Sequence, residues 1–425
     1  MLPYRELKRS RCGTHGLFGG RGRHHSLTER PTMTGQRNTT IFRNVRPMGG
    51  EPIDLTVVDG VVATEARGPV EEVDCGGGVA LPTLVDAHIH PDKTTWGEPW
   101  YSRRAARGIA ELGEQDAEVF RNMPTPVSVR SGRLMGHAVT RGTRAMRAHA
   151  DIAPAYGLEG LLGVGEAAAS LSHALDVRIV AFPQHGVRRA PGTDALMEEA
   201  LRTGAADLIG GIDPEGFDED LDGQLDLVFG LADRYRVGVD IHLHDRGPVG
   251  SRSLWAIIER TRALDMGGSV TVSHAFGVAE VDEGFDALAS ALGEAGIALT
   301  TIAPDPARVL PVARLREHGV RVGVGSDGVR DAWSPFGDAD MLHRAHRLAT
   351  TLRARLDEQL SDAFLTAAND GAALVDLPEV DFTPGSPADF LVVDGECLPQ
   401  IVVDLPPRRL VVRAGRVVAR DGVLV

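Results

Sequence analysis

The apolar residues of this chain follow two different periods, and the change between them divides the sequence into parts. Short runs in which apolar and polar residues alternate occur towards both ends: 41–45, 55–58, 60–62, 389–393 and 410–418. Alternation with a period of two is typical of strands that bury one face. We therefore expect residues 41–80 and 380–425 to form one small β-sandwich domain built from both termini.

The middle of the chain alternates strand-like and helix-like segments. Eight strand candidates can be counted: 80–88, 143–150, 177–183, 207–213, 237–243, 269–275, 297–303 and 321–326. Helical patterns lie between them, for example at 192–203 and 283–295. This order predicts an α/β fold, a (β/α)₈ TIM-type barrel over residues 81–379. The alternative is an open doubly wound sheet, but the Gly-rich dinucleotide fingerprint is missing after the first strand.

The first 40 residues differ from the rest in charge and pattern. They carry a net charge of +6, so the remainder carries -20 of the total of -14. They show neither the apolar stretch of a secretory signal nor a regular period, and we expect a disordered or non-native extension, with Met33 as the true start. An acidic body argues against nucleic acid as a partner.

The cysteine pattern and the hydropathy of the sequence indicate the cellular compartment. The three cysteines are scattered, with no C-x-x-C pair, which favours a reducing cytoplasm over a disulfide framework. No run of 18 apolar residues occurs, so we expect no membrane span. The length of 425 residues suits one large barrel with a satellite domain. A homo-oligomer stays open.

Metal-binding residue types gather at the ends of the predicted strands, where barrel enzymes place their active sites. His88 and His90 end the first strand two residues apart, so both imidazoles point to one face and form half of a metal site. Further candidates end strands five, six and eight: His242, His244, His274 and Asp327. Each is weak alone, but their order along one eight-strand count is a strong signal.

These residues stand in stretches that resemble the amidohydrolase superfamily, in its cytosine deaminase-like branch. Within that branch they look closest to the N-isopropylammelide isopropylaminohydrolases. The matching stretches are 84–93, 180–184, 210–214, 240–245, 270–275 and 326–333. The resemblance extends from about residue 41 to the end of the chain.

The resemblance implies one divalent ion, held by four residues: His88, His90, His242 and Asp327. It places His274 beside the bound water or the substrate. Three imidazoles and a carboxylate favour zinc, with iron(II) as the alternative. No lysine follows the strand-four motif 211–214, so a second ion bridged by a carbamylated lysine is not expected.

The implied reaction is attack of a metal-activated water on a small nitrogen heterocycle, followed by cleavage of a carbon–nitrogen bond. Asp327 would take the water proton, and His274 would polarise the developing anion. The chain reads H-x-H-D at 242–245 where cytosine deaminases carry H-x-x-E. The aspartate reaches less far than glutamate. The isopropylammelide hydrolases share the H-x-H-D pattern, and this resemblance implies that His244 or Asp245 carries the proton to the leaving amine.

Substrate contacts are expected from two side chains. Gln184, at the end of strand three, matches a substrate-contacting glutamine of the deaminases, and Lys93 could meet a substrate oxygen. Gly328 stands where relatives carry a side chain, and we expect the pocket to be wider there.

We expect several other polar residues to have structural roles or to lie outside the site. Asp331 and Trp333 are expected to brace the loop after strand eight. His149, at the end of strand two, should either line the barrel mouth or lie in the core. The helical stretch 343–347 is expected on the surface.

We weigh three alternatives against the function of a deaminase or N-dealkylating amidohydrolase. A barrel that only binds ligands would show degraded metal ligands, whereas all four positions are intact. A phosphotriesterase-like esterase would call for the missing lysine on strand four. Cytosine deaminase proper is disfavoured by the two departures at 242–245 and Gly328.

Overall fold

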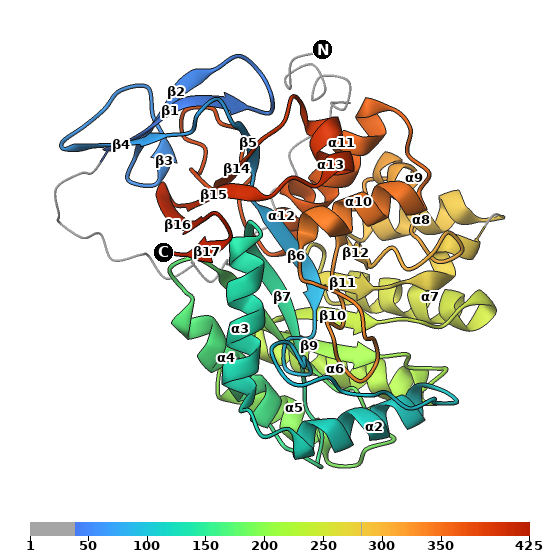
Figure 1. Cartoon of the computed structure of the whole chain (residues 1–425). Coiled ribbons are helices and arrows are strands. Elements are labelled where there is room, and N and C mark those ends of the chain that lie inside the picture. The colour runs from blue at the N-terminus through green and yellow to red at the C-terminus, as the bar shows by residue number, and fades with distance from the viewer. Residues whose placement is uncertain (1–38, 282) are drawn as a thin grey trace.

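The computed structural model describes residues 39–425 except 282, and its centre is a parallel eight-stranded sheet rolled into a barrel (Figure 1). Its strands follow the chain in order: β6 (Leu84–Ile89), β7 (Thr143–Asp151), β8 (Asp176–Phe182), β9 (Leu208–Ile212), β10 (Gly238–His242), β11 (Val270–Ser273), β12 (Ala298–Thr301) and β13 (Val322–Val324). Each matches one of the eight predicted strands, so the predicted TIM-type barrel is confirmed.

The barrel closes where the residues after β13 meet β6. Ile89 and Asp327 form a parallel bridge, and the Asp327 N–H donates to the His88 carbonyl at 2.8 Å. A Cβ atom at Gly325 would lie 2.5 Å from that same carbonyl oxygen, which is closer than packing allows. Glycine at this position therefore permits the two strands to approach and the sheet to close.

Helices cover the outside of the barrel, and their apolar faces form its main core with the strands. They are α2 (Ile109–Asn122), α3 (Val127–Thr140), α4 (Glu159–Ser170), α5 (Thr193–Arg202), α6 (Leu221–Tyr235), α7 (Gly247–Ala263), α8 (Phe285–Glu294), α9 (Val312–Glu317), α10 (Met341–Thr351), α11 (Asp357–Ala367) and α12 (Asn369–Leu374), with a 3₁₀ turn η1 (Phe276–Glu280) and a last helix, α13 (Leu398–Asp404). The helices predicted at 192–203 and 283–295 correspond to α5 and α8.

Strands from both ends of the chain build a second sheet beside the barrel, as the blue and red arrows of Figure 1 show. They are β1 (Thr39–Pro47), β2 (Ile53–Val58), β3 (Val61–Val62), β4 (Val70–Asp74), β5 (Val79–Pro82), β14 (Phe390–Val393), β15 (Arg408–Arg413), β16 (Arg416–Arg420) and β17 (Val423–Leu424). β1 pairs with β2 and β4 at one end and with β5 at the other, so the sheet folds over its own core. Phe42 and Phe390 meet there edge to face at 4.9 Å.

One predicted boundary was wrong. The candidate strand 80–88 is two strands, because β5 pairs with β14 of the outer sheet and β6 pairs with β7 of the barrel. Thr83 lies between them and donates its N–H to the Asp389 carbonyl at 3.2 Å. Both strands are fully buried, so their apolar residues form one continuous run in which periodicity cannot mark the break.

Buried ion pairs join the second sheet to the barrel. Asp389, just before β14, accepts from Arg144 at 3.1 Å and from Arg413. Arg413 also pairs with Asp176, at the start of β8, and Arg144 lies at the start of β7. The sheet is therefore attached near the amino ends of β7 and β8, which leaves the carboxyl ends of the strands free for a site.

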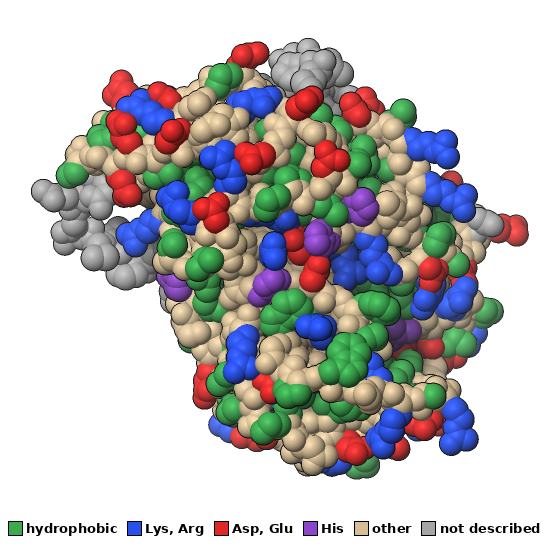
Figure 2. All heavy atoms as spheres, in the orientation of Figure 1, with side chains coloured by type: hydrophobic (Ala, Val, Ile, Leu, Met, Phe, Trp, Pro, Cys, Tyr) green, Lys and Arg blue, Asp and Glu red, His purple; other side chains and the backbone are tan. Residues whose placement is uncertain are grey.

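The predicted extension at residues 1–40 lies outside the described residues, except for Thr39 and Thr40, which begin β1. Acidic and basic side chains are interspersed over the face shown in Figure 2. None of the helices in the described part of the chain has the length and apolar character that crossing a membrane requires.

We predict that Asp389→Ala lowers the free energy of unfolding by about 3–5 kcal/mol, because it leaves the buried guanidinium of Arg144 without a carboxylate and removes one of the two carboxylates that pair with Arg413. Asp394→Ala is the matched control, since its pair with Arg409 is exposed, with 73% of the Asp394 side chain accessible. The control should change stability by about 0–1 kcal/mol. Urea denaturation followed by circular dichroism measures both, and equal losses would contradict the interpretation.

Candidate metal centre and active site

The predicted ligands meet at the carboxyl end of the barrel. His88 lies in β6, His90 follows it, His242 ends β10, and Asp327 follows β13. A cavity of about 910 Å³ opens over them, lined by His90, His242, His274 and Asp327 among others. The four residues predicted to hold an ion come from three places in the sequence, and the fold brings them together.

The spacing of their donor atoms suits one metal ion. The His90 and His242 Nε2 atoms lie 3.2 Å apart, and Asp327 Oδ1 lies 3.4 Å from His90 Nε2 and 3.6 Å from His88 Nε2. Ligand atoms bound at about 2.0–2.1 Å in a tetrahedron stand about 3.3 Å from one another. His88 Nε2 is buried and has no hydrogen-bond partner in the described structure. The donor set therefore fits a divalent cation.

The backbone is strained at several residues that point into this site. Asp213, His274 and Asp327 each follow a barrel strand and have positive φ angles of 31°, 68° and 62°. Side-chain-bearing residues rarely adopt this conformation, and such residues cluster at functional sites. At these three residues the positive φ angle changes the direction of the backbone where the chain leaves the sheet, at the mouth of the barrel.

A buried chain of hydrogen bonds orients His88. Its Nδ1 lies 2.9 Å from the Ser273 hydroxyl, which donates to Asp240 at 2.6 Å and accepts from Thr300 at 3.0 Å. Asp240 in turn accepts from Arg147 at 2.9 Å. Because the serine proton goes to Asp240, His88 must donate its Nδ1–H, which leaves the Nε2 lone pair for the ion.

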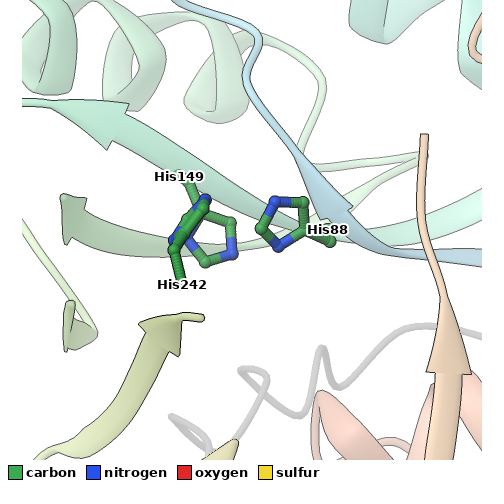
Figure 3. Close-up of side chains that lie close together, drawn as sticks. All are labelled: His88, His149 and His242. Carbon is green, nitrogen blue, oxygen red and sulfur yellow. The ribbon is translucent and has the colours of Figure 1, made fainter. Parts of the chain in front are cut away.

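His149 joins this cluster from β7. Figure 3 shows its ring close to those of His88 and His242, and the three rings can offer ligand atoms within 4.8 Å of one another. Both His149 nitrogens are buried without a hydrogen-bond partner in the described structure, and Nε2 lies 3.7 Å from Asp240. The sequence left two places open for His149, the barrel mouth or the core, and in the structure it lies buried beside His88 and His242, in a group that could hold a metal ion.

His244 forms a dyad with Asp213 on the opposite wall of the cavity. Its Nδ1 lies 2.6 Å from the Asp213 carboxylate, and its ring stacks on His274 with centroids 4.4 Å apart. Burial acts to lower the pKa of His244, but Asp213 outweighs it and the net pKa is raised. Burial and the charge of His244 keep the pKa of His274 well below its usual value. One imidazole is therefore inclined to hold a proton and the other is neutral.

Asp245 lies outside the cavity wall. Its carboxylate accepts from the Gly216 N–H at 2.9 Å, and it is absent from the described residues that line the cavity. Burial and the neighbouring Asp213 raise the pKa of Asp245. Of the two proton carriers suggested by the H-x-H-D motif, only His244 reaches the cavity in this conformation.

Lys93 and Gln184 both line the cavity and contact each other. Lys93 Nζ donates to Gln184 Oε1 at 2.5 Å and pairs with Asp151 at 3.1 Å and Asp116 at 3.7 Å. Burial opposes the charge of Lys93, but the carboxylates outweigh it and raise its pKa. Because the amide oxygen of Gln184 accepts from Lys93, its NH₂ group is left to donate into the cavity.

The expected widening of the pocket at Gly328 is wrong. A Cβ atom there would lie 2.0 Å from the Asp331 carboxylate, which fills the space of the missing side chain. Asp331 also accepts from the N–H groups of Trp333 and Ser334, as expected for a residue that braces this loop. Burial, and then Asp116, raise the pKa of Asp331 to about 7, so this cavity-lining carboxyl can be protonated near neutral pH.

Sequence reasoning missed two features of the site. Asp213 was part of a quoted motif but received no role, although its position after strand four predicted that it faces the barrel mouth. The stretch 343–347 was expected on the surface, and His343 and Arg347 are exposed, but together with Arg344 they also line the cavity, which was not foreseen. Nothing in a helical pattern shows which polar residues border a cavity instead of open solvent.

Comparisons of sequence and structure with known proteins point to a single enzyme family. The sequence profile of the amidohydrolase family matches residues 71–419. The structure of N-isopropylammelide isopropylaminohydrolase from Burkholderia multivorans is 37% identical, covers 91% of this chain and 100% of its own, and superposes with a TM-score of 0.86. N-isopropylammelide isopropyl amidohydrolase from Pseudomonas sp. strain ADP is 30% identical over 88% of this chain and 94% of its own length. A 5-methylcytosine deaminase structure from Klebsiella pneumoniae is 25% identical over 90% of this chain and 98% of its own, with a TM-score of 0.76.

We predict that Ser273→Ala weakens binding of the divalent ion by about 10–100-fold, because His88 loses the partner that orients it. Ser253→Ala is the matched control, since Ser253 is also buried but has no hydrogen-bond partner for its hydroxyl in the described structure. Chelator competition measures the affinity, and elemental analysis should find about one ion per chain in the wild type. Equal metal affinity in both variants would show that the serine has no part in the site.

Proposed function

Because the chain belongs to the amidohydrolase family, we propose that it hydrolyses a non-peptide carbon–nitrogen bond of a small nitrogen heterocycle, as a deaminase or an N-dealkylating enzyme. The observation that carries the proposal is that His88, His90 and Asp327 offer ligand atoms within 4.8 Å of one another, with His242 Nε2 3.2 Å from His90 Nε2, beside a cavity that His244 of the His244–Asp213 dyad also lines. The names of the relatives, which refer to an ammelide and a methylcytosine, support a heterocyclic substrate.

We propose that His88, His90, His242 and Asp327 hold one divalent ion, with His149 as an adjacent imidazole. Zinc suits this donor set and its tetrahedral spacing, and iron(II) is the alternative. When bound, such an ion acts as a Lewis acid and lowers the pKa of water to about 7. No lysine follows β9 in the motif 211–214, which supports a single ion and disfavours a phosphotriesterase-like site.

Proton transfer falls to the residues around that centre. The second carboxylate oxygen of Asp327 accepts the proton of the attacking water. His244, held by Asp213, gives a proton to the departing amine, which its raised pKa favours. His274, neutral and stacked on His244, donates to the oxygen or nitrogen on which negative charge develops.

The opposite wall orients the substrate. Lys93 and the Gln184 amide donate to the edge of the heterocycle, and Phe182 packs behind the His242 ring with centroids 3.8 Å apart. The Asp331 carboxyl, which takes the place of a side chain at Gly328, is a hydrogen-bonding group next to Asp327. This replacement separates the pocket from that of cytosine deaminase proper.

The setting of the protein is part of the proposal. We infer a reducing cytoplasm from Cys75 and Cys397, which are both free, and from the acidic body of the chain. The same acidity supports a small-molecule substrate and no nucleic-acid partner. A homo-oligomer stays open.

We predict that His244→Gln lowers kcat by about 10²-fold or more while the ion stays bound, because it removes a positioned proton donor. Asp245→Asn keeps the hydrogen bond to Gly216 and should retain most of the activity. Steady-state kinetics and elemental analysis of both variants test the assignment. Full activity in His244→Gln together with a large loss in Asp245→Asn would assign the proton to Asp245 instead.

The substrate class is tested by a screen for released ammonia or alkylamine over pyrimidines, triazines, pterins and cyclic ureas, with cytosine and N-isopropylammelide as reference compounds. We expect release from an amino- or alkylamino-substituted ring, and weak activity on cytosine. A kcat/KM for cytosine of about 10⁵ M⁻¹s⁻¹ or above, with nothing on the bulkier compounds, would establish cytosine deaminase proper. A metal-loaded protein inert on every ring would favour a binding protein.

A further inference from the structure

The outer part of the cavity has an excess of positive charge. Its described lining includes Arg246, Arg308, Arg344 and Arg347, although the whole chain carries a net charge of -14. Figure 2 shows Lys and Arg side chains gathered beside histidines towards the middle of one face. The described lining as a whole holds five Lys or Arg side chains against three aspartates, and such an excess in a cavity attracts ligands of negative charge.

Two of these arginines are held in place by backbone carbonyl groups. Arg344 donates to Ile302 at 2.9 Å and Ser326 at 2.8 Å, and Arg347 donates to Ala303 at 2.9 Å and Pro304 at 2.8 Å. Each guanidinium has five N–H donors, so these bonds leave several free on both. The acceptors lie just beyond β12 and β13, which fixes both guanidinium groups at the barrel mouth.

The other cations of the cavity already have acidic partners. Arg246 pairs with Glu280, Arg308 with Asp305, and Lys93 with Asp151. Among residues 39–281 and 283–425, by contrast, neither Arg344 nor Arg347 has a carboxylate within salt-bridge distance.

The acids that act most strongly on Arg344 have other hydrogen-bond or ion-pair partners. Asp86 accepts from the Ser326 and His88 N–H groups, Asp338 lies 2.5 Å from His343, and Asp327 lies 3.4 Å from His90. The two arginines are three residues apart on α10 and so share a helix face, where like charges repel. Burial lowers the pKa of Arg344 against the opposing charge of Asp86, and the charge of Arg347 adds to the lowering. An anion between them would relieve this repulsion.

We infer that Arg344 and Arg347 bind a carboxylate carried by the substituent on the nitrogen of the carbon–nitrogen bond that is hydrolysed. Guanidinium groups bind carboxylates through paired, charge-assisted hydrogen bonds, and their fixed geometry here selects for such a group. The inference rests on the proposed function, because it takes the ring to lie at the metal centre, with its substituent directed towards α10.

The test compares N-isopropylammelide with its N-(1-carboxyethyl) analogue, in which a carboxylate replaces one methyl group. The metal-loaded enzyme is assayed for turnover, and binding of each compound is measured by calorimetry. We expect kcat/KM to favour the carboxylate compound by about tenfold or more, as hydrogen bonds to charged groups allow. Arg347→Gln, at an exposed position, and Arg344→Gln should each remove most of this preference through KM, while Arg344→Lys retains part of it.

Arg202→Gln, on α5 away from the cavity, is the control and should keep the preference. Turnover of both compounds without a preference would overturn the inference and leave the proposed function standing. No turnover, but tighter binding of the carboxylate compound that Arg347→Gln abolishes, would support the inference while counting against hydrolysis of this ring. Equal or absent binding, with no turnover, would count against both.

Discussion

The whole site depends on how the barrel closes. The strand that ends the barrel meets the strand that begins it through the backbone of Asp327, which bridges Ile89 and donates to His88. The same residue places its carboxylate 3.4 Å from His90. Closure and assembly of the metal centre are thus one event, because the sheet cannot close without bringing the carboxylate of the last strand to the imidazoles of the first.

The closed barrel then carries polar groups through its interior, where each must find a partner. Ser273, Asp240 and Arg147 form a continuous chain from His88 downwards through the sheet. This chain of hydrogen bonds fixes the tautomer of His88, so that Nε2 is the nitrogen with a lone pair for the proposed ion. The buried charge of Lys93, which lines the cavity, is likewise stabilised by partners, since the carboxylates of Asp151 and Asp116 offset the cost of its burial.

Much of this arrangement could be predicted from the sequence, and the rest could not, for physical reasons. Apolar runs and turn residues located all eight barrel strands, and the two-residue spacing of His88 and His90 placed both on one face. The assignment of Asp331 to the space beside Gly328 depends on how a loop folds back on itself. Periodicity records which residues face the interior of the fold, and carries no record of which loop residues meet.

The helix α10 is a second example of what the sequence pattern could not predict. Arg344 and Arg347 have the pattern of solvated residues, and their role depends on carbonyl groups just beyond β13 and β12, which lie 18 and 44 positions earlier in the chain. The outer sheet is attached at the amino ends of β7 and β8, and the buried pair of Arg408 with Asp340 also attaches it to the start of α10. Most residues at the carboxyl ends of the strands lie outside these attachments and can vary to suit a substrate. Asp327 is the exception, because its backbone closes the barrel while its side chain completes the site.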